Sequence, residues 1–519
     1  MEERYLASVD LGSYKVALTV AKVQGEDVEI LYYKQKPSDG IRYSAVYNPK
    51  KASDAIRVLI RDAEEELKIR ILQVVVGLPR CDVRQETNSA VVDRVNPDEN
   101  ITTEEIETLK FMAQSGYPLS DPDKEQLYGA VAQSYSTEEE FQLIEDDIIG
   151  MVPEHLEGNF KLFIGKKSSV RNIDKVFNSL DIAIAAKYFT PGTTARAVLK
   201  SDEMQSGVAL IDFGGGATSV TIYHKQIMRY YGAIPFGGDV ITADIQNECT
   251  ISRHLAENIK LAWGACQPDR LASLEEKIIQ IEDEELGYKQ IPVKYLSEII
   301  TARTKEIIEA ILYHIERSGL ADDLRSGIVI TGGGAELANI LSYIKELSGF
   351  NARKGLPRHL FSASGCQGAK ETGAAPSIGM ILAAKEDIAL NCIDPVMEDE
   401  EEETADAGRQ ESYSDYGSDT PYDTTRTEEE EEVSHTPYRR QSSNPLLQGE
   451  GEGASIEDED NSGNLFSDDE VPVTEKPGRR GRKKDKGPKK ESLLKIKWKT
   501  LAGKIYDTIT EEDTSDEDM

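Results

Sequence analysis

The apolar positions of residues 1–393 follow two periods along the chain, which predicts strands interleaved with helices. Period-two alternation and continuous apolar runs predict strands, expected at 5–11, 15–23, 27–34, 72–78, 206–213, 217–224 and 326–331. Apolar residues spaced three and four apart predict helices, expected at 51–67, 237–247, 252–264, 293–318 and 334–347. This order of elements predicts an α/β fold with sheets covered on both faces.

Two glycine-rich turns of the same form interrupt this pattern. They read VDLGSYKV (9–16) and IDFGGGATSV (211–220), and each follows an apolar strand that ends in Asp. An Asp in that place can hold Mg²⁺ directly or through water, and the glycines let backbone N–H groups approach phosphate oxygens. The pair predicts two related half-domains that hold one nucleoside triphosphate between them.

A third glycine turn strengthens this interpretation. IVITGGGAEL (328–337) is an apolar run followed by three glycines and a helical pattern. Such a backbone can pack closely against a flat ring or a phosphate. One glycine turn alone is compatible with a plain tight turn, whereas three in this order favour a nucleotide site.

The three turns resemble the phosphate-1, phosphate-2 and adenosine loops of the actin, heat-shock chaperone and sugar kinase superfamily. ETGAAPSIGMILA (371–383) is similar to that superfamily's second connecting helix, and LAENIKLAWGAC (255–266) resembles an element of the bacterial actins. The resemblance implies an actin-like ATPase fold of two RNase H-like half-domains with inserted subdomains. It also implies that ATP and Mg²⁺ bind between the halves.

By this resemblance, Asp10 and Asp212 hold Mg²⁺, mostly through water, and no catalytic residue is assigned. The residues expected to line the phosphates are Gly12, Ser13, Tyr14, Lys15, Gly214, Gly215, Gly216 and Thr218. Those expected to hold the adenosine are Glu257, Lys260, Gly332, Gly333 and Gly334. Glu257 and Lys260 also fit an exposed pair on a helix, since positions i and i+3 share a face.

An insertion narrows the resemblance to FtsA, a bacterial actin-like division protein. Residues 85–166 suggest a small α+β unit with a helix at about 103–115 and then short strands. FtsA carries a compact subdomain before the second glycine turn, and its T-x-E-[DE]-I motif matches 103–106 with a one-residue shift. The segments LIDFGGGATSVTIY and IPFGGDVITADI also resemble FtsA.

The FtsA resemblance implies a division of the chain into subdomains. Their expected ranges are 1–84 and 167–200, with part of 360–393, for 1A; 85–166 for 1C; 201–236 and 319–359 for 2A; and 237–318 for 2B. A disordered linker, acidic and then basic, is expected at 394–490, followed by an amphipathic membrane helix at 491–510 and an acidic tail at 511–519.

The resemblance also implies a function. FtsA proteins bind ATP, self-associate into filaments and tether FtsZ filaments to the cytoplasmic face of the inner membrane at the division site, together with other division proteins. The C-terminal peptide of FtsZ is expected on subdomain 2B, in a groove along 291–312 that includes Arg303. Arg303 also fits an exposed arginine on an amphipathic helix. The segment 182–199 contains no Gln or Glu to orient water, so at most a weak ATPase is expected.

Charge is distributed unevenly along the 519 residues. The net charge of −34 divides into −23 for 394–475, +10 for 476–510 and −6 for the last nine residues, which leaves −15 for the body. The acidic stretch has few apolar residues to offset its ordering entropy, which predicts the disordered linker. It could be a docking site or a solvated spacer. The five cysteines are scattered and the N-terminus has no apolar signal, which predicts a cytosolic protein.

The segment 492–509 has the pattern of an amphipathic helix. Apolar residues recur at Leu494, Trp498, Leu501 and Ile505, on one helical face. A polybasic stretch, KPGRRGRKKDKGPKK, precedes it. A helix of this kind with a basic cluster predicts reversible attachment to an anionic lipid membrane.

Other interpretations compete with this one. The helix could dock on the protein's own core or on a partner protein, and the basic stretch could contact nucleic acid. Nucleic acid is disfavoured, since few aromatic residues interleave with the basic ones. Among enzymes, a sugar or acetate kinase or a chaperone-like ATPase of the same superfamily is the alternative. Neither class needs a lipid-binding helix on a long tether.

Overall fold

The computed structural model describes residues 3–271, 277–283, 287–357 and 360–395. The expected membrane residues Leu494, Trp498, Leu501 and Ile505 lie outside the described residues, as does the linker beyond Pro395. None of the helices in those four ranges is both long and apolar enough to cross a membrane.

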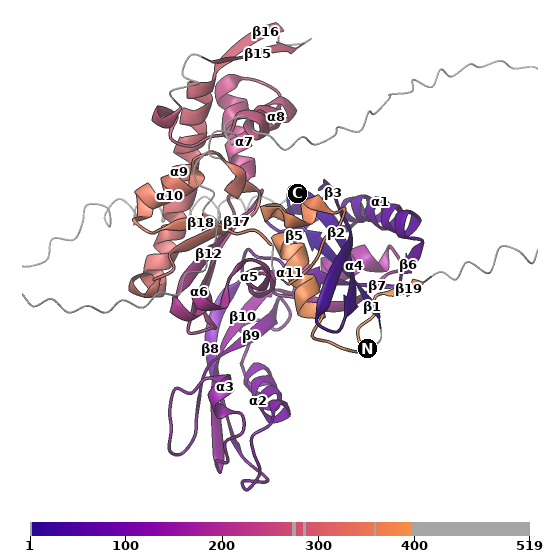
Figure 1. Ribbon diagram of the computed structural model, residues 1–519, viewed down its shortest axis with the longest axis vertical. Helices are drawn as coiled ribbons and strands as arrows, with labels where there is room; N and C mark the ends of the chain where they lie inside the picture. The colour runs from indigo at the N-terminus through magenta and orange to yellow at the C-terminus, as the bar shows by residue number, and fades with distance from the viewer. Residues whose placement is uncertain (1–2, 272–276, 284–286, 358–359, 396–519) are drawn as a thin grey trace, which may run out of the picture. The chain divides into compact units, whose positions relative to one another are not determined.

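The N-terminal half is built on a five-stranded sheet in the order β3-β2-β1-β7-β11 (Figure 1). Its strands are β1 (Arg4–Leu11), β2 (Lys15–Gln24), β3 (Asp27–Pro37), β7 (Gln73–Gly77) and β11 (Ala183–Tyr188). The first three form an antiparallel meander, and β7 joins β1 in parallel, as β11 joins β7. The β1–β2 and β2–β3 connections are short, whereas the parallel pairs need longer crossovers.

A second five-stranded sheet repeats this topology. Its order is β14-β13-β12-β17-β18, with an antiparallel meander followed by two parallel pairings. The strands are β12 (Val208–Phe213), β13 (Thr218–His224), β14 (Ile227–Ile234), β17 (Ile328–Thr331) and β18 (Ala352–Lys354). The shared order shows two related α/β half-domains, so the predicted actin-like fold class is confirmed.

Helices cover both faces of the first sheet. Helices α1 (Pro49–Leu67) and α4 (Lys167–Asn178) contact each other, and α1 packs on β2 and β3. On the other side, α11 (Ala375–Ala384) packs on β1, β2 and β7 and against α5 (Thr190–Val198) (Figure 1). All ten residues of α11 are buried.

The second half-domain carries a group of three helices that contact one another in sequence. Helix α9 (Val293–Ser318) packs on β13 and β14 and against α7 (Gly238–Cys249), which in turn contacts α8 (Arg253–Trp263). The buried isoleucines of α9 form one stripe of its surface, as the spacing predicted. The hairpin β15 (Ile278–Asp283) and β16 (Gly287–Pro292) precedes α9.

The insertion forms a three-stranded antiparallel sheet in the order β8-β10-β9, with α2 (Thr103–Ser115) against it. Its strands are β8 (Arg84–Asp93), β9 (Glu125–Ser136) and β10 (His155–Lys166). The expected helix is confirmed, but the expectation of short strands is wrong, because β9 and β10 each run for twelve residues. Polar residues occupy many of their positions, and the apolar pattern is therefore interrupted.

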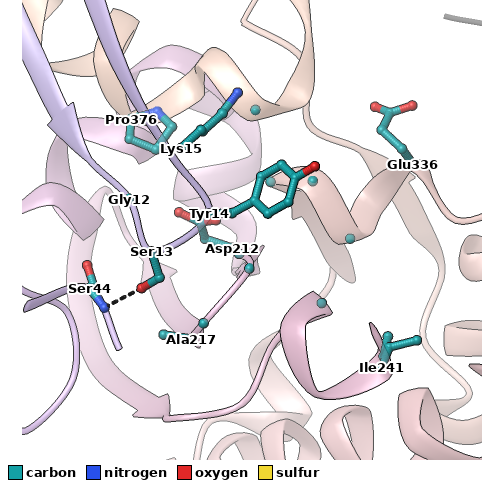
Figure 2. A pocket seen from close by; sticks show the side chains of 18 of the residues that line it. Gly12, Ser13, Tyr14, Lys15, Ser44, Asp212, Ala217, Ile241, Glu336 and Pro376 are labelled. Carbon is teal, nitrogen blue, oxygen red and sulfur yellow. Dashed lines mark hydrogen bonds between the residues drawn. The ribbon is translucent and has the colours of Figure 1, made fainter. Parts of the chain in front are cut away.

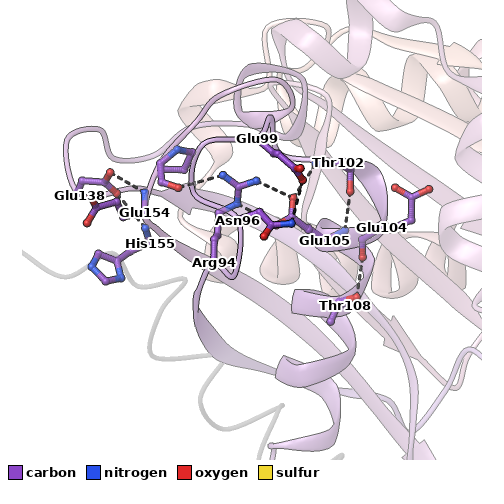
Figure 3. Close-up of polar contacts among 11 residues, drawn as sticks. Arg94, Asn96, Glu99, Thr102, Glu104, Glu105, Thr108, Glu138, Glu154 and His155 are labelled. Atoms are coloured by element: carbon purple, nitrogen blue, oxygen red, sulfur yellow. Dashed lines mark hydrogen bonds and ion pairs between the residues drawn. The ribbon is translucent and has the colours of Figure 1, made fainter.

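A buried arginine ties α2 to the insertion's sheet (Figure 3). The Arg94 side chain is 2% exposed, and it donates from Nε and Nη2 to the Glu105 carboxylate at 3.0 and 3.1 Å. Its Nη1 donates to the Pro153 carbonyl at 3.1 Å. Glu105 also accepts from the Thr102 backbone N–H, which completes a capping box at the start of α2.

Helix α10 begins at Ile340, whereas the sequence predicted a helix from 334. The 3₁₀ turn η4 (Gly333–Glu336) stands in its place, and Asn339 has φ of 63°. A left-handed residue does not continue an α-helix, so α10 starts after it.

The remaining elements are short, and β19 pairs with β6, so two residues assigned to the linker, Asp394 and Pro395, form part of a strand. These remaining short elements are β4 (Ile41–Arg42), β5 (Ala45–Val46), β6 (Ile69–Ile71), α3 (Glu145–Ile148), α6 (Ser201–Ser206), η1 (Pro268–Arg270), η3 (Ala321–Asp323), η5 (Gln367–Lys370), η6 (Thr372–Ala374) and β19 (Ile393–Pro395).

Candidate nucleotide site

A cleft lies where the two glycine turns meet (Figure 2). The β1–β2 turn and the β12–β13 turn both line it, and so does the turn after β17. It holds about 1040 Å³ of space, counting the part that is open to solvent.

The two glycine turns approach each other more closely than side chains would permit. A Cβ atom on Gly216 would lie 2.7 Å from the Cβ and Oγ of Ser13, and one on Gly215 would lie 2.6 Å from the Cβ of Tyr14. The Ser13 hydroxyl accepts a hydrogen bond from the Ser44 backbone N–H at 2.8 Å (Figure 2). Glycine at 215 and 216 therefore allows the backbones of the two halves to face the same space.

The second turn also holds the start of α7. The N–H groups of Gly238 and Asp239 donate to the carbonyls of Gly214 and Gly215 at 2.9 and 2.8 Å. Gly214 N–H donates in turn to the Ala217 carbonyl at 3.0 Å. These bonds fix the turn against a helix N-terminus, where the helix dipole favours an anion.

Three charged side chains meet at the bottom of the cleft. Asp10, Asp212 and Arg80 are 7%, 5% and 9% exposed, and Arg80 forms an ion pair with Asp212. Burial raises the pKa of Asp10, and the charge of Arg80 opposes that shift. Burial acts to lower the pKa of Arg80, but Asp212 and Asp10 outweigh it and the pKa is raised.

Lys15 follows the first turn but extends toward β3. Its Nζ contacts Gln35 Oε1 and lies 3.4 Å from the Tyr33 hydroxyl. Figure 2 shows the side chain beside Pro376, pointing away from Asp212. Arg80 is the cation that forms an ion pair with Asp212.

Glu257 and Lys260 form a largely buried pair that lines the cleft. Their side chains are 16% and 10% exposed, and Lys260 Nζ lies 2.7 Å from Glu257 Oε2. Lys260 also donates to the Gly238 carbonyl at 2.9 Å and to the Thr242 hydroxyl at 2.7 Å. Of the two sequence interpretations, the exposed pair is wrong, because both side chains face inward onto α7.

The third glycine turn packs on the second half-domain's sheet. Gly332 has φ of 82°, and a Cβ on Gly334 would lie 2.3 Å from the Phe213 ring. The Thr372 hydroxyl lies 2.9 Å from the Gly332 carbonyl and 2.8 Å from Glu336 Oε1. This turn and the residues before α11 thus form one wall of the cleft.

The cleft brings together all but one of the residues predicted to bind nucleotide. The exception is Thr218, which is fully buried and whose hydroxyl donates to the Phe236 carbonyl at 2.8 Å. Sequence reasoning missed other residues that line the cleft: Ser44, Arg80, Ala217, Gly238, Ile241, Leu261, Glu336, Leu337, Gly373 and Pro376. No cleft-lining residue in the described chain comes from 182–199.

The one sequence signal for Arg80 is its position after a predicted buried strand. Arg80 comes three residues after β7, which is parallel to β1, and Asp10 lies near the carboxyl end of β1. The carboxyl ends of neighbouring parallel strands share one edge of a sheet, where ligands bind. A polar residue after the predicted strand 72–78 therefore falls beside Asp10.

Arg303 is predicted to bind a partner peptide, and it is already engaged within the chain. It donates from Nη2 to Asp244 Oδ1 at 3.0 Å and from Nη1 to Glu306 Oε2 at 2.6 Å, and its Nε lies 2.5 Å from Asp244 Oδ2. The hydrogen bond to Asp244 raises the pKa of Arg303. Its side chain is 31% exposed, so one part still faces solvent.

The comparisons with known proteins agree with the sequence resemblance. Residues 209–378 match the family model described as "Cell division protein FtsA". The chain is 28% identical over 363 residues to the protein of that name from Neisseria meningitidis, covering 69% of this chain and 85% of the relative. It is 28% identical over 358 residues to the one from Streptococcus pneumoniae, covering 69% and 77%. The predicted resemblance to FtsA is confirmed.

A solved structure shows the same fold. The chain of the "PilM-PilN type IV pilus biogenesis complex" superposes with a TM-score of 0.51 at 13% identity, covering 73% of this chain and 98% of that one. At this identity the likeness supports the fold alone, in agreement with the duplicated sheet topology.

Proposed function

We propose that this FtsA relative is an ATP-binding, actin-like division protein that tethers FtsZ filaments to the cytoplasmic face of the membrane at the division site. The observation that carries the proposal is the cleft between two sheets of identical topology, lined by all three glycine turns. The match of the chain to proteins named for cell division supports the cellular role.

The residues of the cleft fit a nucleoside triphosphate. The glycine turns that follow β1 and β12 line one cleft at close approach, and α7 begins beside the second turn. These turns would hold the phosphates. The buried pair Glu257 and Lys260 and the turn at 332–334 would hold the adenosine. An ATP bound across both halves would favour the closed arrangement by its differential affinity for that state.

The donor set for Mg²⁺ fits less well. Asp10 and Asp212 are buried carboxylates of the kind that Mg²⁺ prefers, and they would hold the ion mostly through water. Asp212 is already ion-paired with Arg80, so the ion and the guanidinium compete for one carboxylate. Within the described residues, no group of three or more His, Cys, Asp or Glu side chains could hold a metal. When bound, Mg²⁺ would neutralise phosphate charge.

Membrane attachment rests on the sequence of the C-terminal region. Leu494, Trp498, Leu501 and Ile505 lie on one face of the predicted helix, and the polybasic stretch precedes them. Two weak signals together give stable but reversible binding. Self-association into filaments and contacts with other division proteins follow from the FtsA resemblance.

We propose that the C-terminal peptide of FtsZ binds along α9. A peptide-binding assay without membranes tests this proposal. A fluorescent peptide should bind the full chain, and Arg303→Ala should weaken binding severalfold. Lys305→Ala is the matched control, since Lys305 is a second cation on α9 and its ion-pair partner among the described residues, Glu309, is 4.0 Å away. Equal affinities for wild type and Arg303→Ala would assign Arg303 to its contact with Asp244 instead.

A further inference from the structure

Arg80 lines the cleft but has no part in the function proposed above. It comes from the first half-domain, three residues after β7, and its guanidinium contacts Asp212 in the second. A buried arginine costs desolvation energy unless it is fully paired. Its place beside the buried Asp212, within the electrostatic reach of Asp10, therefore calls for a physical explanation.

The backbone of Arg80 is held rigidly. The hydroxyl of Tyr231 donates to the Arg80 carbonyl, and Tyr231 packs edge-on against the rings of Phe163 and Phe189. The thiol of the next residue, Cys81, lies 3.8 Å from the Ile234 carbonyl. These contacts anchor the loop after β7 and aim the side chain into the cleft.

The guanidinium has donor capacity that its contacts do not use. It carries five N–H donors. One nitrogen, Nη1, contacts Asp212, and Nε is only 3.5 Å from the Ser44 hydroxyl. Within the described part of the chain, no hydrogen bond is found for Nη2, which lies 3.9 Å from the position of a Cβ on Gly214. The remaining donors thus lie beside the second glycine turn.

We propose that Arg80 binds the terminal phosphate of a nucleoside triphosphate and supplies there the positive charge that a divalent cation would otherwise provide. This rests on the proposed nucleotide binding and deepens it. Arginine is suited to the role because its planar fork binds phosphate oxygens in pairs and stays charged. The Lys15 side chain, by contrast, is turned toward Gln35 and Tyr33 on β3.

The proposal has two measurable consequences. A diphosphate lacks the group that Arg80 contacts, so the protein should prefer a triphosphate. Asp212 already has a cationic partner, so triphosphate binding should depend little on Mg²⁺. A purely structural Arg80 would affect triphosphate and diphosphate alike, and it would not change the dependence on Mg²⁺.

Both consequences can be tested by isothermal titration of the full chain. The ligands are AMPPNP, ADP and inorganic tripolyphosphate, each titrated with Mg²⁺ and with EDTA. For wild type, EDTA should weaken AMPPNP binding less than about threefold, and tripolyphosphate should bind without metal. Arg80→Gln should lose about ten- to hundredfold in AMPPNP affinity in EDTA, the range for a charged hydrogen bond. Its ADP affinity should stay within about twofold, and its AMPPNP binding should become strongly Mg²⁺-dependent.

Two further variants keep the test decisive. Arg80→Gln leaves Asp212 buried without its partner, so the double variant with Asp212→Asn removes that charge if the single variant fails to fold. The double variant should show the same selective loss. Arg42→Gln is the matched control, because Arg42 is an exposed arginine that does not line the cleft. If wild type binds no adenine nucleotide, the proposed function fails as well. Alternatively, wild type binds nucleotide while Arg80→Gln, or the double variant, loses the same affinity for AMPPNP as for ADP, or loses no affinity for either. In that case only the role of Arg80 is overturned.

Discussion

The two glycine turns can approach each other closely because the second turn has glycine, which carries no side chain, where they meet. Gly216 faces Ser13, and Gly215 faces Tyr14, at distances that leave no room for a methyl group. These glycines are evident from the sequence as part of IDFGGGATSV. Their contact is not, because it depends on how the two half-domains close, and that depends on residues far away in the chain.

Gly216→Ala should therefore damage the nucleotide cleft. The added methyl group would meet the Ser13 side chain at 2.7 Å and displace the hydroxyl that accepts from Ser44 N–H. We expect a loss of about tenfold or more in ATP-analogue affinity, equivalent to the 1–3 kcal/mol typical of overpacking. Titration calorimetry measures it. Gly129→Ala is the control, since nothing lies within 4 Å of a Cβ there; similar affinities for both variants would contradict the expectation.

Acid should destabilise the fold of the insertion by protonating Glu105. Its hydrogen bonds with Arg94 lower the pKa of Glu105. A carboxylate whose pKa is lower in the folded than in the unfolded protein stabilises the folded state. This stabilisation is complete above the pKa of the unfolded state and is lost as the pH falls through the pKa of the folded state. Glu105→Gln should cost about 1 kcal/mol at pH 7, a value discounted because the side chain is 36% exposed.

Denaturant unfolding at pH 7 and at pH values stepped down below 4.5, the ordinary pKa of a glutamate, tests this prediction. The difference between wild type and Glu105→Gln should shrink as the pH falls. Glu104→Gln changes an exposed neighbour in the same helical turn and serves as the control. A difference that persists unchanged in acid would show that shape rather than charge at residue 105 supports α2.

At the level of elements, strongly periodic segments were predictable. Helices α1 and α9 and strand β12 lie within one to two residues of their predicted bounds, because burial of one face or of a whole strand leaves a clear pattern. The predicted start of α10 was wrong, since Phe213 and the left-handed Asn339 impose a turn there. Those constraints come from packing between distant segments, which periodicity does not report.

The close packing of α5 against α11 requires a glycine at position 379. A Cβ on Gly379 would lie 2.1 Å from the Thr193 carbonyl oxygen, a backbone atom that cannot move aside alone. Gly379→Ala should destabilise the protein by about 1–3 kcal/mol, as overpacking does, and lower its midpoint in thermal or denaturant unfolding. Gly192→Ala on α5 meets only the flexible end of Met228 at 3.4 Å. That control should be neutral or slightly stabilising, and an equal cost at both positions would refute the close-contact argument.

For the molecule as a whole, the duplicated sheet order explains why one cleft collects residues from so many segments. The three glycine turns were predicted from the sequence to share one site, and all three line the cleft. Arg80 was missed because no motif marks it, and only the parallel register of β7 beside β1 places it by Asp10. Thr218 was misplaced because its hydroxyl satisfies a buried carbonyl instead of facing the cleft.

Charge along the chain gives a prediction about membrane binding. The stretch 394–475 carries −23 and the basic segment 476–510 carries +10, so the first can compete with anionic lipid for the second. Deletion of 398–470 should tighten binding to vesicles that contain an anionic lipid, in a co-sedimentation assay at low ionic strength. The gain should shrink as salt is added. Unchanged or weaker binding by the deletion variant would rule out this competition.

The measurement that tests the central claim most directly is co-sedimentation of FtsZ with anionic liposomes, in the presence of ATP, by the full chain and by a variant that ends at Thr474. The variant lacks the basic stretch and the predicted helix with Leu494, Trp498, Leu501 and Ile505. The account predicts that the full chain carries FtsZ into the liposome pellet and that the truncated chain leaves it in solution. Equal recovery of FtsZ with both chains, or none with either, would contradict the tether.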